Sequence, residues 1–108
     1  MANAYEVLGQ TTDTATGTAL VTVPASTEVV VSTLVICNRA SADKTFRIYI
    51  RPDDEALADK HYLAYDTTIV ANDSITMTLG ITMNASDKLY VYGSDANLSF
   101  SAFGTKIT

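Results

Sequence analysis

Two neighbouring segments rich in β-branched and aromatic residues, Glu28–Asn38 and Lys44–Arg51, constrain the fold most strongly and predict a hairpin of two long strands. The second segment alternates, so Phe46, Ile48 and Ile50 are expected to face a core. The first segment is apolar on both sides, and a strand of this kind is covered on both faces, by a second sheet, another subunit or a partner. The hairpin therefore predicts a β-sandwich.

Simple alternation along these strands also suggests which residues form contacts with other proteins. In the first segment it places valines on one side, with Val30, Leu34 and Ile36 on the other. In the second segment it points arginine and tyrosine side chains outward. A later segment, Lys88–Tyr92, has two tyrosines at alternate positions, which share a face in the same way. Arg and Tyr are enriched at interface hot spots. The candidate interface residues are Val29, Val31, Val35, Arg47, Tyr49, Arg51, Tyr90 and Tyr92.

Short apolar or alternating segments, separated by turn residues, fill the rest of the chain. They are Tyr5–Leu8, Thr18–Val23, His61–Asp66, Ser74–Met83, Lys88–Tyr92 and Asn97–Phe103. Seven or eight short strands at this spacing predict an all-β chain, a single small antiparallel β-sandwich or jelly-roll-like domain. At most one short helical turn is expected, near residues 53–59, where acidic residues precede Ala56-Leu57-Ala58.

The chain divides into an N-terminal part and a sandwich domain. Residues 1–17 include the polar tract GQTTDTATG and are expected to form an arm or an edge strand followed by a polar loop. Residues 18–108 are expected to form the β-sandwich. The length of 108 residues is sufficient for one domain that buries a core without disulfides or metals.

Charge and composition argue against some classes of binding partner. The net charge is −5 and no basic run occurs, which argues against a nucleic acid partner. No apolar run approaches the roughly 20 residues of a membrane helix, so no membrane partner is expected. The N-terminus lacks the features of a signal peptide, and the single cysteine excludes an intrachain disulfide. We expect synthesis in a cytoplasm, without a secretion signal.

Few residues suggest catalysis or metal binding. Cys37 and His61 are the only cysteine and histidine, and a nucleophilic pair would require them to meet. The more economical interpretation makes both structural, with Cys37 a small hydrophobe in a core or interface. The acidic cluster Asp53, Asp54, Glu55 and Asp59 lacks the glycine of a calcium loop and reads as a solvated loop, with a cation site or a carboxylate pair as the alternatives. We expect no enzyme activity, no cofactor and no metal.

Four segments of the sequence resemble small virion proteins of tailed bacteriophages, notably cyanophages and marine phages. They are VSTLVICNR (31–39), RPDDEALADKHYLAYD (51–66), ANDSITMTLGI (71–81) and NLSFSAFG (97–104). The run Asp59-Lys60-His61-Tyr62 and the closing segment Phe100–Gly104 carry the most specific part of the likeness, which extends from about Val30 onward. The N-terminal region, roughly Met1 to Gly17, matches least.

The resemblance implies a non-catalytic capsid decoration (cement) protein on the outer surface of the virion. Its partners would be the major capsid protein and further copies of itself, commonly as trimers near local three-fold positions. Repetition on a symmetric lattice would give avidity from weak contacts. The alternative is a tail, neck or fibre-associated module that binds other tail proteins or host glycans through exposed tyrosines.

Overall fold

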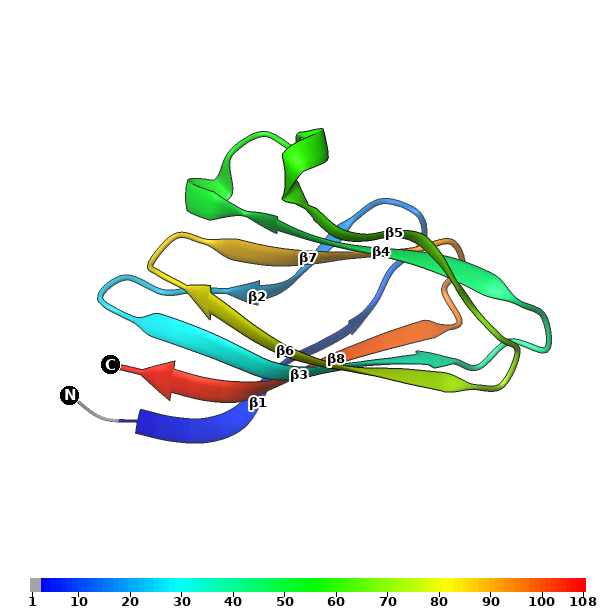
Figure 1. Cartoon of the computed structure of the whole chain (residues 1–108), viewed down its shortest axis with the longest axis horizontal. Helices are drawn as coiled ribbons and strands as arrows, with labels where there is room; N and C mark the ends of the chain where they lie inside the picture. Colours follow the sequence, from blue (N-terminus) through cyan, green and yellow to red (C-terminus); the bar gives the residue numbers. More distant parts are fainter. Residues whose placement is uncertain (1–2) are drawn as a thin grey trace.

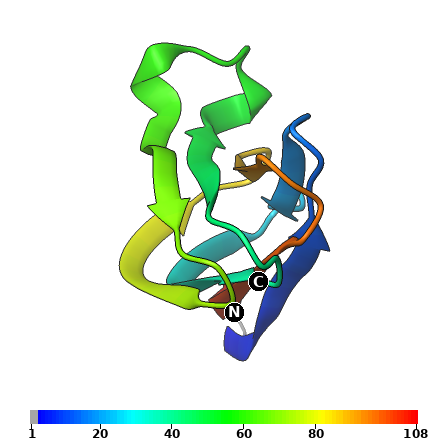
Figure 2. The same ribbon diagram turned by 90° about the vertical axis from the view of Figure 1, so that its right-hand side faces the viewer.

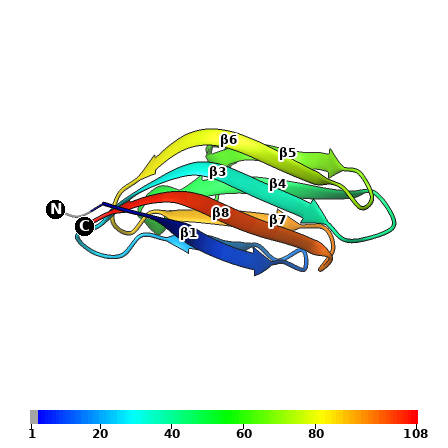
Figure 3. The same cartoon turned by 90° about the horizontal axis from the view of Figure 1, so that it is seen from below.

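The computed structural model describes residues 3–108, which form two four-stranded antiparallel sheets packed face to face (Figures 1 and 3). Sheet A has the strand order β1-β8-β3-β6, and sheet B has the order β2-β7-β4-β5. The strands are β1 (Asn3–Thr12), β2 (Thr18–Thr22), β3 (Glu28–Asn38), β4 (Lys44–Arg51), β5 (Tyr62–Ile69), β6 (Ser74–Met83), β7 (Lys88–Gly93) and β8 (Leu98–Ile107). The prediction of a small all-β sandwich is confirmed.

The strand pairs follow a simple rule that defines the topology. β1 pairs with β8, β2 with β7, β3 with β6 and β4 with β5, all antiparallel. The chain can thus be described as one long hairpin with its tip between β4 and β5. The hairpin is wrapped so that its open end, β1 and β8, lies in sheet A, whereas its tip, β4 and β5, lies in sheet B. This arrangement is a jelly roll. The tip contains the only helical structure in residues 3–108, the 3-10 turns η1 (Pro52–Asp54) and η2 (Asp59–His61) (Figure 2). Two short turns thus occur where at most one was expected near residues 53–59, and residues 55–58 between them are not helical.

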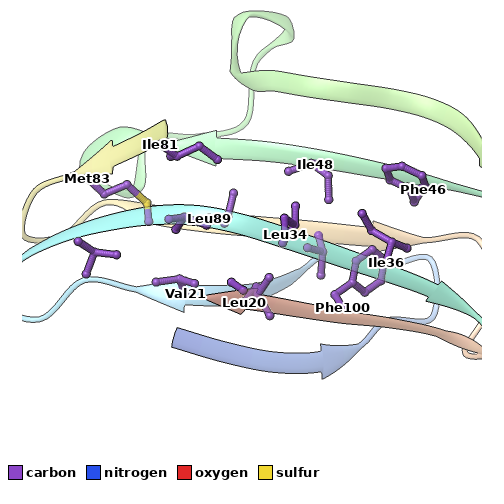
Figure 4. Close-up of a cluster of buried hydrophobic side chains, with 14 of the residues drawn as sticks. Leu20, Val21, Leu34, Ile36, Phe46, Ile48, Ile81, Met83, Leu89 and Phe100 are labelled. Carbon is purple, nitrogen blue, oxygen red and sulfur yellow. The ribbon is translucent and has the colours of Figure 1, made fainter. Parts of the chain in front are cut away.

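The core fills the space between the sheets with aliphatic side chains and two phenylalanines (Figure 4). The inner faces of β3, β4, β7 and β8 supply most of it because these are the central strands of each sheet. Its fully buried members include Val31, Leu34, Ile36, Phe46, Ile48, Leu89, Val91, Leu98 and Phe100. The alternation predicted for β4 is therefore confirmed, because Phe46 and Ile48 are buried in the core and Ile50 packs against it.

A β-bulge at Ser32 changes the faces of β3. Val31 and Thr33 pair with Gly104 and Phe103, which are consecutive, so Ser32 is an extra residue in β3. Beyond the bulge the alternation is reversed. The buried residues of β3 are Val29, Val31, Leu34, Ile36 and Asn38, whereas Val30, Thr33, Val35 and Cys37 lie half-buried on the opposite face. The expectation that Val35 shares a side with Val29 and Val31, and that Leu34 and Ile36 share a side with Val30, was wrong for this reason.

The N-terminal segment lies along the margin of sheet A. Residues 1 and 2, part of the expected arm or edge strand, fall outside the described residues; from Asn3 the chain forms the edge strand β1, and residues 13–17 form a loop. The strand runs past Leu8 into the polar tract, to Thr12. A Cβ on Gly9 would lie 2.0 Å from the carbonyl oxygen of Leu20 in β2. The two sheets therefore approach backbone to backbone along the β1–β2 side.

Buried Asn38 fastens the loops at the end of β3. Its side chain is 1% exposed. The two hydrogens of the amide Nδ2 are shared among three carbonyl oxygens, those of Ala42 at 3.0 Å, Ile69 at 3.1 Å and Val70 at 3.3 Å, while Oδ1 accepts from the N–H of Ala40 at 2.9 Å. One amide thus holds the β3–β4 loop against the end of β5.

Asp13 organises the loop between β1 and β2. Its carboxylate is 3% exposed and accepts hydrogen bonds from the N–H and hydroxyl of Thr16, the hydroxyl of Thr18 at 2.6 Å and the N–H of Gly93 at 3.0 Å. Burial alone would raise the pKa of Asp13, but these hydrogen bonds outweigh it and hold the pKa below its ordinary value. The carboxylate therefore ties the β1–β2 loop to the end of β7.

No helix within residues 3–108 is long and apolar enough to cross a membrane.

Candidate functional site

Aromatic and cationic side chains cover the outer face of sheet B and form the most distinctive surface of the molecule. We call this group the Tyr/Arg surface; it comprises Arg47, Tyr49 and Arg51 of β4, Tyr62 and Tyr65 of β5, and Tyr90 and Tyr92 of β7. The register brings them together because directly opposed residues share a face. Arg47 lies opposite Tyr92, and Tyr49 lies between Tyr90 and Tyr62.

Arg47 is held rigidly at the centre of one half of this surface. Its guanidinium carbon lies 4.2 Å from the ring centre of Tyr65 and 4.5 Å from that of Tyr92. Two hydrogen bonds join it to Asp66, from Nε to Oδ1 at 2.6 Å and from Nη2 to Oδ2 at 3.3 Å. The Asp66 carboxylate raises the pKa of the guanidinium above its ordinary value. A cation fixed in this way presents its edge at little entropic cost.

Two irregularities in β5 build this arrangement. Between the pairs Phe46–Thr67 and Ile48–Ala64, β5 advances three residues while β4 advances two. Tyr65 and Asp66 consequently both face outward, and Asp66 adopts a left-handed conformation with φ of 46°. A second irregularity, between Ala64 and Tyr62, turns Tyr62 to the same side. Sequence alternation alone did not identify these β5 residues as part of the surface.

Tyr49 forms the buried floor of the Tyr/Arg surface. It is 6% exposed, stacks on Tyr90 with ring centres 5.2 Å apart, and meets Tyr62 edge-on at 5.4 Å. Its hydroxyl lies against Gly17, whose φ of 87° and lack of a side chain make room for it. Burial, with its tyrosine neighbours, raises the pKa of Tyr49. Tyr49 supports the surface from below, and its neighbours are the more accessible groups.

The cations at the other end of the surface are paired with a carboxylate of the β4–β5 connection. Arg51 lies 4.8 Å from the ring centre of Tyr90, and its Nη2 is 3.3 Å from Oδ1 of Asp54. Nζ of Lys88 is 3.1 Å from Oδ2 of the same carboxylate. The surface therefore combines aromatic rings with cations whose charge is largely neutralised by carboxylates. This combination suits contact with another protein better than contact with a polyanion.

An open hollow of about 410 Å³ lies beside the Tyr/Arg surface and is lined by Asp59, Tyr62 and Tyr65. Tyr65 is 57% exposed and meets Tyr62 edge-on at 4.8 Å. Aromatic rings with an adjacent carboxylate offer both an apolar platform and hydrogen-bond acceptors. The hollow is therefore a place on this face where a projecting side chain or a small polar group would fit.

His61 fixes the connection that borders the hollow. It is 5% exposed, and its Nδ1 accepts a hydrogen bond from the N–H of Ala58 at 3.0 Å. The neutral ring therefore carries its proton on Nε2, which donates to Oε1 of Glu55 at 3.0 Å. This hydrogen bond, with Lys60 nearby, holds the pKa of Glu55 below its ordinary value. The structure gives His61 a structural role in shaping the connection.

Replacing His61 with alanine should open the 52–61 connection, because the N–H of Ala58 and the carboxylate of Glu55 lose their partner. A lost set of buried hydrogen bonds of this kind costs about 1–3 kcal/mol. We expect faster cleavage of the variant by a protease of broad specificity, with cleavage sites confined to the connection. Lys60→Ala is the matched control, since the Lys60 side chain is 74% exposed. Equal digestion of both variants would contradict the assignment.

The other residues singled out from the sequence lie apart. Val29 and Val31 are 2% and 0% exposed between the sheets, and Val35 is half-buried on the outer face of sheet A. Cys37 lies on that same face, whereas His61 belongs to the connection beside sheet B, so the fold does not bring the two together. Within residues 3–108, no group of three or more potential ligands could hold a metal ion.

Comparison with known proteins finds a shared fold. No protein-family model and no curated protein matches the sequence. Among solved structures, a chain from the structure of infectious bursal disease virus, Gx strain, superposes on 97% of this chain with a TM-score of 0.52 and 15% sequence identity. The match spans 30% of that viral chain. At this identity the likeness shows the fold alone, a jelly roll that also occurs in a virus structure.

Proposed function

We propose that this chain is a structural protein of a virus particle, and specifically a decoration protein on the outer surface of a bacteriophage capsid. The observation that carries the proposal is the jelly-roll fold, similar along 97% of the chain to a chain of a virus structure. The resemblance of four sequence segments to small phage virion proteins supports the finer assignment. The major capsid protein is the partner that this role requires.

The Tyr/Arg surface is the contact that we assign to the shell. Its rings and paired cations have the composition of interface hot spots, and bulges and salt bridges hold them in place before binding. Tyr65, 57% exposed next to the hollow, is the most accessible of these rings. Repetition over the shell would multiply weak individual contacts.

The copy number of the chain in purified particles tests the role. Quantitative mass spectrometry should give a ratio to the major capsid protein that is one or a simple fraction, as lattice-wide decoration requires. A handful of copies per particle would instead place the protein in the tail or neck. Absence from particles would overturn both assignments.

Tyr65→Ala tests the surface. Truncation of a hot-spot tyrosine costs about 2 kcal/mol or more, which is roughly thirtyfold in affinity. We expect this loss when purified protein is titrated onto capsids that lack it. Tyr5→Ala is the control, because Tyr5 is a tyrosine with 85% exposure on β1 of the other sheet. A larger loss with Tyr5→Ala would move the shell contact to sheet A.

The second candidate role is that of a tail, neck or fibre-associated module that binds host glycans. The hollow lined by Asp59, Tyr62 and Tyr65 favours it, since sugars stack on aromatic rings and donate hydroxyl protons to carboxylates. A low copy number together with saturable binding of a glycan that Tyr65→Ala abolishes would support this role over decoration.

A further inference from the structure

Arg47 shows how the outer face of sheet B holds a guanidinium group. The guanidinium carbon lies over the rings of Tyr65 and Tyr92, 4.2 Å and 4.5 Å from their centres. Its Nε lies 2.6 Å from a carboxylate oxygen of Asp66. Tyrosine rings attract cations to their faces, and a carboxylate adds charge-assisted hydrogen bonds. Two tyrosine rings and one aspartate are therefore the groups that hold an arginine side chain on this face.

The hollow beside the Tyr/Arg surface presents the same set of groups. It is lined by Asp59, Tyr62 and Tyr65 and has a volume of about 410 Å³. The planes of the two rings are perpendicular, with ring centres 4.8 Å apart, so the rings form two walls of a corner. Tyr65 is shared with the site of Arg47. The hollow thus repeats the two rings and the aspartate that surround Arg47, but around open space.

The carboxylate of Asp59 has no cation within this chain. In the part of the chain that the structure describes, no hydrogen bond or ion pair joins it to another residue. The next residue, Lys60, has its Nζ 3.8 Å from Oε1 of Glu55 instead. The two arginines of the Tyr/Arg surface form ion pairs with other carboxylates. The carboxylate is therefore available to a cation from outside the chain, and the net charge of −5 favours its approach.

The hollow is open to a side chain that projects from another protein. The 52–61 connection, which contains Asp59, stands out from sheet B on the side away from sheet A (Figure 1). Asp59 and Tyr65 are both exposed. A planar guanidinium can stack on one ring while its fork of N–H groups faces the carboxylate, whereas an ammonium group is a point charge. The lining therefore suits arginine better than lysine.

We propose that the hollow binds an arginine side chain of the protein that the Tyr/Arg surface contacts. The guanidinium stacks on a ring of the hollow and pairs with the carboxylate of Asp59, as Arg47 does with its own neighbours. That this protein is the major capsid protein rests on the proposed function, whereas the preference for a guanidinium follows from the lining of the hollow alone. A glycan, the ligand of the second candidate role, would need no positive charge.

Titration with a free arginine derivative tests the chemistry of the hollow without a capsid. The probe is Nα-acetylarginine amide, and the matched neutral molecule is Nα-acetylcitrulline amide, whose side chain has nearly the same shape without the charge. The NMR chemical shifts of Tyr62 and Tyr65 report binding. A cation–π contact and an exposed ion pair together should make the arginine derivative bind about tenfold more tightly. Equal affinity for the two molecules would overturn the proposal.

Asp59→Asn tests the carboxylate in the same titration. Loss of the ion pair should weaken binding of Nα-acetylarginine amide about fivefold and leave binding of the citrulline derivative unchanged. Glu28→Gln is the matched control, because it removes one negative charge from an exposed position on β3 of sheet A. An equal loss in the two variants would mean that net charge alone attracts the probe, which would overturn the site.

Titration onto capsids separates this proposal from the proposed function. Asp59→Asn and Tyr65→Ala should both weaken binding to capsids. If Asp59→Asn binds as tightly as the unmodified protein while Tyr65→Ala binds weakly, the arginine contact is overturned and the decoration role stands. If the unmodified protein does not bind capsids, the decoration role fails, and the NMR titration decides by itself whether the hollow holds a guanidinium.

Discussion

Replacing Asn38 with aspartate should lower the free energy of unfolding by about 3–5 kcal/mol at neutral pH, the cost of a buried charge without a partner. The change is almost isosteric. It converts an amide that donates to the carbonyl oxygens of Ala42, Ile69 and Val70 into a carboxylate that faces them. Only the hydrogen bond from the N–H of Ala40 would survive. Denaturant titration followed by circular dichroism measures the loss.

The same variant should show a distinctive dependence on pH. Burial against carbonyl oxygens raises the pKa of the new carboxyl above the unfolded value of about 3.9, so the destabilisation should shrink as the pH falls and the group protonates. Asn3→Asp is the matched control, because Asn3 is exposed at the start of β1 and should tolerate the change. A loss at position 38 no greater than that at position 3 would contradict the role of Asn38.

Replacing Asp13 with alanine should cost about 3 kcal/mol, since the buried N–H of Gly93 and the hydroxyl of Thr18 lose a charged acceptor. Asp13→Asn keeps one acceptor oxygen and should cost less than half as much. Denaturant titration measures both losses. A larger loss for Asp13→Ala than for Asp13→Asn would show that the hydrogen bonds, and not the negative charge, stabilise the loop. Equal losses in the two variants would mean that the charge, and not the number of acceptors, stabilises the loop.

Asp13 also predicts how the unmodified protein responds to acid. Its pKa in the folded state lies below the ordinary value of 3.8. Its ionised form therefore contributes stability that is fully present above the unfolded pKa and is lost as the pH falls below 3.8 through the folded pKa. In Asp13→Asn this part of the acid dependence should disappear. A stability curve of unchanged shape below pH 4 would argue that other carboxylates govern acid unfolding.

The strands were predictable because they obey local rules, whereas the bulges were not. The alternation of β4 and the length of β6 follow from residue types alone. The extra residue at Ser32 is defined by its offset against Gly104 and Phe103 of β8, more than sixty residues later in the chain. No local pattern encodes that offset, and so Val35 was expected on the wrong face.

The Tyr/Arg surface was predictable in part, for the same reason. Tyr90 and Tyr92 were expected to face outward, and they do, because β7 alternates regularly. Tyr65 and Asp66 both contact Arg47 only because β5 is bulged against β4. Asp13 differs from these, since its contact with Thr16 is a local turn that the sequence Asp-Thr-Ala-Thr signals. Its contact with Gly93 is non-local and required the fold.

The wrapped hairpin has a consequence for the order in which the protein can fold. β8 lies between β1 and β3 in sheet A, so β1 lacks its partner, and β3 one of its two partners, until β8 has been synthesised. β7 separates β2 from β4 in sheet B in the same way. The pairs β3–β6 and β4–β5 need neither β7 nor β8 and can form before them. Folding that depends on partners so far apart in the sequence is slow.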